Sequence, residues 1–197
     1  MTHFIAHRIN TVEELKILPK EFGVELDLRD EGNELILQHD PFVSGEKFSD
    51  YLAHYQHGTM ILNIKSERIE HKALELLNKS NITDYFFLDS SFPMIRLLSH
   101  QGEHKCAVRF SEYECLNTVM AMKGVIDWVW VDCFTRLPID TKSFRILKDA
   151  GFKLCLVSPE LQARPEDIES YRIELENSGI IFDAICCKVH NINKWTK

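Results

Sequence analysis

The chain has 197 residues, of which 45% are hydrophobic and 27% are charged, and its formal net charge is -7. A chain of this size buries a sizeable core, so we expect a single domain over residues 1–197, and the negative charge argues against nucleic acid as a partner. The apolar stretches fall short of the roughly 20 residues that span a bilayer and the N-terminus resembles no secretory leader, so we expect a cytoplasmic protein without membrane insertion.

Eight short segments rich in β-branched and aromatic residues follow one another along the chain, and each is predicted to form a strand. In chain order they cover residues 3–9, 23–29, 59–65, 84–91, 105–111, 127–134, 152–159 and 182–189. Segments between them place apolar residues at helical spacing and close on Gly or Asn, which predicts helices. The clearest of these helical segments are residues 68–81, 112–124, 140–151 and 164–179.

Strands that alternate with helices predict an α/β fold with a parallel sheet and right-handed crossovers. Eight such units are the number that closes a (β/α)8 TIM barrel, so we expect one compact barrel. An open doubly wound sheet is the alternative. It is disfavoured because no predicted strand is followed by the glycine-rich phosphate loops GxGxxG or GxxxxGK[ST].

The active site of such a barrel lies at the carboxyl ends of its strands, so polar residues there are the candidates. They are His7, Arg8, Glu25, Asp27, His39, Asn63, Lys65, Asp89, Arg109, Asp132 and Lys188. Asp89, Arg109, Asp132 and Lys188 are the weaker candidates, because single polar residues at strand ends often pack or anchor a loop. The first three strands therefore carry the strongest functional pattern.

Side chains alternate along a strand, so Glu25 and Asp27 share one face, and so do Asn63 and Lys65. Two buried carboxylates repel each other unless positive charge lies beside them. The pattern therefore predicts either a divalent cation on these oxygens or a network of ion pairs with Arg8 and Lys65.

Three short motifs follow one another in the first part of the chain: AHR at residues 6–8, ELD at residues 25–27 and HDP at residues 39–41. Together they resemble the signature of the glycerophosphodiester phosphodiesterases, which belong to the phospholipase-C-like phosphodiesterase TIM barrels. LNIK at residues 62–65 falls where that family carries a third acidic ligand followed by a lysine. The resemblance spans most of the chain, is specific over the first third, and is that of a short, divergent member.

The resemblance implies a phosphoric diester hydrolase of lipid metabolism whose partner is a small glycerophosphodiester-like or polyol phosphodiester. His7 and His39 would be the general acid and base on opposite sides of the phosphorus. Arg8 and Lys65 would hold the nonbridging oxygens, whose negative charge grows in the transition state. These residue types suit that chemistry, since histidine exchanges protons near neutral pH and the reaction develops anionic charge.

Glu25, Asp27 and Asn63 are the metal ligands that the resemblance implies, and their hard oxygens favour Mg²⁺ or Ca²⁺. Asn63 departs from the family pattern because an amide stands in place of the third carboxylate, so we expect weaker cation binding. About twenty residues separate His39 from the next strand, too few for the inserted cap of typical members. We therefore expect an open site, and the substrate alcohol stays undefined.

Two other functions stay open. One is a degenerate barrel that binds a phosphorylated metabolite or a protein partner without turnover, which the amide at Asn63 and the missing cap favour. The other is a metal-independent enzyme resembling the bacterial phosphoinositide-specific phospholipases C, with Arg8 or Arg109 in the place of the cation. The presence of both Glu25 and Asp27 argues against that second alternative.

Overall fold

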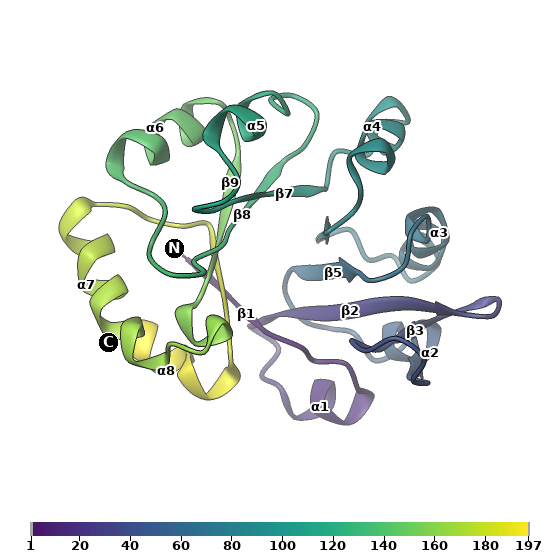
Figure 1. Ribbon diagram of the computed structural model, residues 1–197. Coiled ribbons are helices and arrows are strands. Elements are labelled where there is room, and N and C mark those ends of the chain that lie inside the picture. The colour runs from purple at the N-terminus through teal and green to yellow at the C-terminus, as the bar shows by residue number, and fades with distance from the viewer. Residues whose placement is uncertain (1, 197) are drawn as a thin grey trace.

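The structure is a computed structural model that describes residues 2–196, and it shows helices arranged around a curled sheet (Figure 1). All eight predicted strands are present and parallel, which confirms the α/β class. They are β1 (His3–Ala6), β2 (Gly23–Glu31), β5 (Met60–Ile64), β6 (Tyr85–Leu88), β7 (Ala107–Phe110), β8 (Trp128–Val131), β9 (Lys153–Val157) and β10 (Ala184–Cys187).

A helix follows each parallel strand along the chain, as the alternating pattern predicts. These are α1 (Val12–Ile17), α2 (Phe48–Leu52), α3 (Glu70–Lys79), α4 (Phe92–His100), α5 (Leu116–Met120), α6 (Thr141–Asp149), α7 (Ile168–Ser178) and α8 (Ile192–Trp195). Short 3-10 helices lie at η1 (Pro159–Gln162), η2 (Pro165–Asp167) and η3 (Val189–Asn191). The predicted helix over residues 112–124 is shorter than expected and begins only at Leu116.

The curled sheet is continuous from β6 through β5, β2, β1, β10, β9 and β8 to β7. Between β6 and β7, however, the described residues form a single isolated bridge, Phe87 to Cys106, instead of a ladder. The Phe87 amide donates to the Lys105 carbonyl at 2.8 Å across this bridge, whereas the Cys106 carbonyl faces β8 and accepts from the Trp128 amide at 3.2 Å. In the curled sheet, β6 and β7 are thus joined by this one bridge among the described residues, which leaves a seam between the two strands.

An added hairpin extends β2 beyond the curled sheet. The returning chain brings His39 back toward the carboxyl edge of that sheet. The second half of β2 pairs antiparallel with β3 (Glu34–Leu37), and β3 pairs with β4 (Glu46–Lys47). Gly32 has a φ of 60° in the connecting turn, a conformation that glycine adopts without a steric penalty. The Arg29 guanidinium then donates to the His39 carbonyl at 2.9 and 3.2 Å and fixes that segment of backbone.

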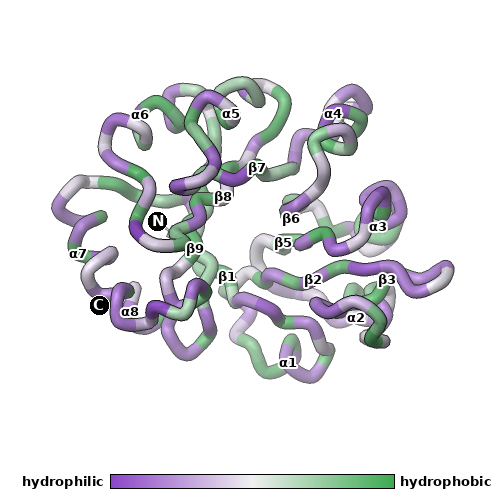
Figure 2. The backbone as a smooth tube through the Cα atoms, viewed as in Figure 1, coloured by the Kyte–Doolittle hydropathy of each residue, from purple (hydrophilic) through white to green (hydrophobic). Residues whose placement is uncertain are grey.

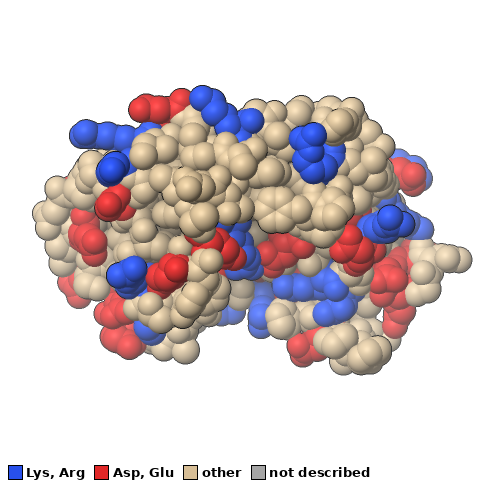
Figure 3. Space-filling model, turned by 45° about the horizontal axis from the view of Figure 1, so that its top comes forward, with Lys and Arg blue, Asp and Glu red and all other residues tan. Residues whose placement is uncertain are grey.

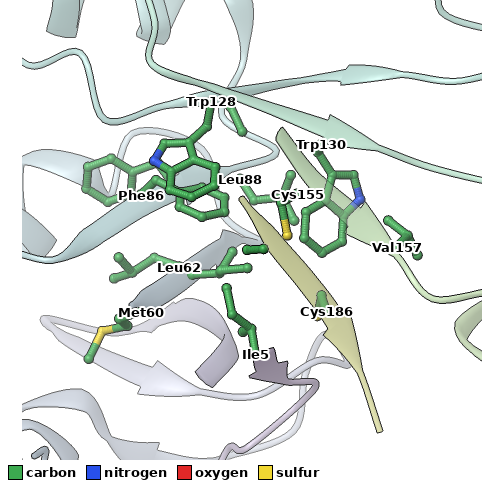
Figure 4. Packing of buried hydrophobic residues seen from close by; sticks show 14 of the residues in the cluster. Ile5, Met60, Leu62, Phe86, Leu88, Trp128, Trp130, Cys155, Val157 and Cys186 are labelled. Atoms are coloured by element: carbon green, nitrogen blue, oxygen red, sulfur yellow. The ribbon is translucent and has the colours of Figure 1, made fainter. Parts of the chain in front are cut away.

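The core consists of apolar side chains from the strands and from the inner faces of the helices. Figure 4 shows part of it, where the indole of Trp128 stacks on the ring of Phe86 at a centroid distance of 4.5 Å. Trp130 is also buried. In Figure 2, apolar residues follow β1 and β9, whereas the hairpin of β2 and β3 carries polar residues toward its tip. In the described part of the chain, no helix is long and apolar enough to cross a membrane.

Candidate functional site

A cavity of about 180 Å³ opens at the carboxyl ends of the strands, where the sequence predicts the active site. Figure 3 shows acidic and basic side chains gathered around a hollow on one face of the molecule. The cavity is lined by His7, Arg8, Glu25, Asn63, Lys65, Arg109, Trp130, Asp132, Val157, Leu161 and Gln162. Seven of the predicted site residues therefore share one cavity, although they come from distant parts of the chain.

Glu25 lies at the floor of this cavity and is 1% exposed. Its Oε1 accepts a hydrogen bond from Asn63 Nδ2 at 2.8 Å, and its Oε2 accepts one from the Arg8 amide at 2.8 Å. That amide follows the end of β1, where the backbone of Arg8 adopts a φ of 56°. Burial, and then the negative charge of Asp27, raise the pKa of Glu25 to about 7.

Asp27, two residues further along β2, is completely buried and is held by a side chain that the motifs do not reveal. Asn10 Nδ2 donates to Asp27 Oδ2 at 2.9 Å, and the Asp27 amide donates to Asn10 Oδ1 at 2.8 Å. Arg8 Nε lies 3.7 Å from Oδ2, and Lys65 Nζ lies 3.4 Å from Oδ1. The predicted ion pairs of Asp27 with Arg8 and Lys65 are thus present.

Asn10 occupies its position because the chain turns into α1 directly after β1. Thr11 caps this helix in a capping box with Glu14, which fixes the turn that carries the Asn10 side chain back to β2. A threonine followed three residues later by glutamate predicts the start of the helix from the sequence. The sequence does not predict that Asn10 contacts Asp27, because this contact depends on how β1 and β2 align.

Replacing Asn10 by Ala is expected to lower the free energy of unfolding by about 1–3 kcal/mol, because it leaves a buried carboxylate oxygen without its hydrogen-bond donor. Urea denaturation followed by circular dichroism measures this change. Asn33→Ala, at an exposed hairpin position, is the matched control and should change stability little. Equal stability of the two variants would show that Asn10 does not support Asp27.

His7 follows β1 and lies between the side chains of Lys188 and Glu25. Its Nδ1 is 3.0 Å from Lys188 Nζ, and its Nε2 is 3.7 Å from Glu25 Oε2. Burial, followed by the positive charges of Lys188 and Arg8, lowers the pKa of His7 to about 3. His7 is therefore a neutral imidazole at physiological pH.

His39 lies at the rim and is not among the residues that line the cavity. Its Nδ1 is 2.8 Å from Asp40 Oδ1, and 38% of its side chain is exposed. Arg29 donates to the carbonyls of both His39 and Lys65, which places the His39 backbone beside a residue that lines the cavity. The two acids and His7 converge as predicted, and His39 stands apart from them toward solvent.

Two buried oxygens bear on the expected cation. Asp27 Oδ1 and Asn63 Oδ1 accept no hydrogen bond from any described residue, and the ladder between β2 and β5 places the two residues opposite each other. No group of three or more His, Cys, Asp or Glu side chains suited to a metal occurs among the described residues. Two carboxylates and one amide nevertheless supply the hard oxygen donors that Mg²⁺ or Ca²⁺ prefers, so these residues fit such a cation.

The weaker candidates Asp89, Arg109 and Asp132 form a network of their own beside the seam. Arg109 donates from Nε and Nη2 to both Asp89 oxygens at 2.8 Å, and its Nη1 donates to Asp132 Oδ2. Asp132 Oδ1 also accepts from Gln162 Nε2 at 2.8 Å, a partner with no signal in the sequence. Both aspartates thus neutralise Arg109, which leaves it less suited to replace a metal cation at Glu25 and Asp27.

No protein-family profile matches this sequence, and no curated protein matches it. Among solved structures, a glycerophosphodiester phosphodiesterase from Agrobacterium tumefaciens str. C58 superposes with a TM-score of 0.70, at 17% identity over 94% of this chain and 96% of that one. A glycerophosphoryl diester phosphodiesterase from Parabacteroides distasonis ATCC 8503 gives a TM-score of 0.64, at 12% identity over 94% of this chain and 82% of that one. The resemblance to this family is therefore confirmed at the level of the fold.

Proposed function

We propose that this chain, which shares the fold of glycerophosphodiester phosphodiesterases, is a phosphoric diester hydrolase that acts on a small glycerophosphodiester-like or polyol phosphodiester. The observation that carries the proposal is the single cavity that joins the imidazole of His7, the buried carboxylate of Glu25 and the cationic groups of Arg8 and Lys65 at the carboxyl ends of the strands. The proposed architecture is a (β/α)8 barrel in which the bridge from Phe87 to Cys106 completes the ring.

Cleavage of a phosphodiester by water needs a base for the attacking hydroxyl and an acid for the leaving oxygen. His7 and His39 take these two roles in the proposal. The attacking water loses a proton to one imidazole as its oxygen bonds to phosphorus. The bond from phosphorus to the leaving oxygen breaks as His7 Nε2 gives its proton to that oxygen, while His7 Nδ1 takes a proton from the Lys188 ammonium group and the ring stays neutral. The products are a phosphomonoester and a free alcohol.

The charge of the cavity suits an anionic diester. Arg8, Lys65 and Arg109 line the cavity with positive charge and Glu25 and Asp132 with negative charge, while Lys188 adds a positive charge behind His7 and Asp27 a buried negative one beside Lys65. Among the lining residues three cationic groups face two carboxylates, which favours a ligand with one negative charge, as a phosphodiester has. In the proposal Arg8 and Lys65 hold the nonbridging oxygens, whose negative charge increases as the transition state forms.

Asp27, Asn63 and Glu25 are the residues that would hold Mg²⁺ or Ca²⁺. When bound, the cation adds positive charge to the nonbridging oxygens of the substrate. The surrounding residues orient the two carboxylates. Asn63 Nδ2 and the Arg8 amide orient Glu25, and Asn10 orients Asp27. The support for the cation is the pair of buried oxygens that lack a donor.

Replacing Asn63 by Asp is expected to lower the melting temperature in the presence of EDTA and to increase the stabilisation that millimolar Mg²⁺ or Ca²⁺ provides. The variant removes a donor from Glu25 and adds a third carboxylate, which repels the other two until a cation binds. Differential scanning fluorimetry with and without each cation measures both effects. Asn33→Asp, at an exposed turn, is the control, and an equal cation response in both variants would contradict the assignment.

The test of the function is alcohol release from a panel of glycerophosphodiesters and from bis(para-nitrophenyl) phosphate, with EDTA and with each divalent cation. Turnover supports the proposal. The second candidate is a protein that binds a phosphorylated ligand without turnover, favoured by the exposed position of His39 outside the cavity and by the amide at Asn63. Calorimetric binding of glycerol phosphate with no turnover of any diester in the panel would establish that candidate instead.

A further inference from the structure

Lys188 makes a direct contact with His7 that the motifs do not predict. The two residues follow neighbouring strands, since β1 and β10 are paired through Ala6 and Cys187. The His7 amide donates to the Cys187 carbonyl at 2.9 Å, which holds both backbones in register just before the two side chains meet. Lys188 Nζ then lies 3.0 Å from His7 Nδ1.

This contact determines which nitrogen of His7 carries the proton. A lysine ammonium group has three donors and no acceptor, so His7 Nδ1 must be the acceptor. A neutral imidazole has one N–H, which therefore lies on Nε2. Nε2 is the nitrogen that faces Glu25 Oε2, at 3.7 Å, beside the cavity.

The backbone of Lys188 is itself held by groups from other elements. Its backbone amide donates to Glu160 Oε1 at 3.0 Å, and the other oxygen of Glu160 accepts from Ser158 Oγ. Ser158 is fully buried and accepts a hydrogen bond from Trp195 Nε1 at 2.9 Å. This chain of contacts fixes the backbone from which the lysine side chain reaches His7.

His39 has the opposite arrangement. Asp40 Oδ1 lies 2.8 Å from His39 Nδ1, and a carboxylate only accepts, so the proton of neutral His39 lies on Nδ1 and its Nε2 carries a lone pair. His7 and His39 thus present different tautomers, one with an N–H on Nε2 and the other with a free lone pair on Nε2.

We infer that Lys188 is a positioning residue that fixes the tautomer of His7, so that His7 presents an Nε2 hydrogen-bond donor to the substrate phosphodiester. The role in turnover rests on the proposed function, whereas the tautomer itself is a property of the protein without substrate. Because Lys188 touches His7 through Nδ1, it acts through the imidazole and not on the reacting atoms.

Long-range proton–nitrogen correlation spectra of the ¹⁵N-labelled full chain test the inference, with the His7 signals assigned by their loss in His7→Ala. Wild-type His7 should give the pattern of a neutral ring with its proton on Nε2. Lys188→Met should shift His7 toward the Nδ1–H form, and Lys188→Arg, which keeps a donor, should restore the wild-type pattern. Lys194→Met, on the exposed side of α8, is the matched control and should leave His7 unchanged.

If the chain hydrolyses diesters, Lys188→Met should lower kcat by about 10-fold to 10²-fold, part of the usual contribution of a proton-transferring group, and Lys188→Arg should recover most of it. A wild-type His7 with its proton on Nδ1, or a Lys188→Met variant with an unchanged His7 spectrum, would overturn the inference. The expected spectra without any turnover would refute the proposed function while leaving the role of Lys188 in place.

Discussion

Replacing His7 by Ala is expected to lower kcat/KM for bis(para-nitrophenyl) phosphate by about 10²–10⁴-fold, the range that general acid–base groups usually contribute. The reason is that His7 is the imidazole inside the cavity, beside the buried carboxylates and the cationic side chains. His39→Ala should have an effect in the same range, because each imidazole serves a different proton. Initial rates over a range of substrate concentrations measure both variants.

His190→Ala is the matched control, since His190 is exposed and lies two residues beyond Lys188 without lining the cavity. It should retain wild-type rates. Thermal unfolding of all three variants separates a catalytic loss from a folding defect. Wild-type activity in His7→Ala would exclude His7 as an acid–base group, and the proposed mechanism with it.

Replacing Arg109 by Met is expected to lower the free energy of unfolding by about 3 kcal/mol, the lower end of the range for a buried ion pair that loses one partner. The lower end applies because the Arg109 side chain is 28% exposed, whereas Asp132 is almost completely buried. The variant leaves the Asp132 carboxylate with hydrogen bonds from Gln162 and from the Cys133 amide but without its cation. Guanidinium denaturation at neutral pH measures the change.

Two further variants make this prediction specific. Lys47→Met breaks an ion pair with Glu34 in which both side chains are more than half exposed, so it should cost less than about 1 kcal/mol. Arg109→Met combined with Asp132→Asn removes both charges while an amide oxygen still accepts from Gln162, and it should recover part of the lost stability. If the double variant loses as much stability as Arg109→Met and Asp132→Asn lose together when each is made alone, the predicted coupling is contradicted.

The two interpretations of Glu25 and Asp27, as metal ligands or as partners in ion pairs, meet at one atom, Asp27 Oδ1. Asp27 Oδ2 is engaged by Asn10 and faces Arg8, whereas Asp27 Oδ1 has only Lys65 at 3.4 Å, outside hydrogen-bond geometry. The ion pairs therefore stabilise the buried acids in the absence of a ligand. Asp27 Oδ1 and Asn63 Oδ1, on which the proposed cation would depend, accept no hydrogen bond, and a cation at Oδ1 would take the place of the Lys65 ammonium group there.

The sequence by itself determined the order of strands and helices and the position of the polar cluster. These follow from local patterns, since apolar periodicity and helix caps act over a few residues, as Thr11 and Glu14 do at the start of α1. The motifs at residues 6–8, 25–27 and 62–65 lie at the ends of parallel strands that pair with one another. That pairing explains why most of their side chains line one cavity.

Only the tertiary structure decided which side chains pair. Three contacts join residues from different strands or loops. They are the contact of Asn10 with Asp27, that of Lys188 with His7, and the pairing of Arg109 with two aspartates. Such contacts depend on strand register and on the curl of the sheet, which a single sequence does not encode locally. The seam between β6 and β7, where a single bridge joins Phe87 to Cys106, likewise belongs to the strand register, which the pattern of eight strands does not reveal.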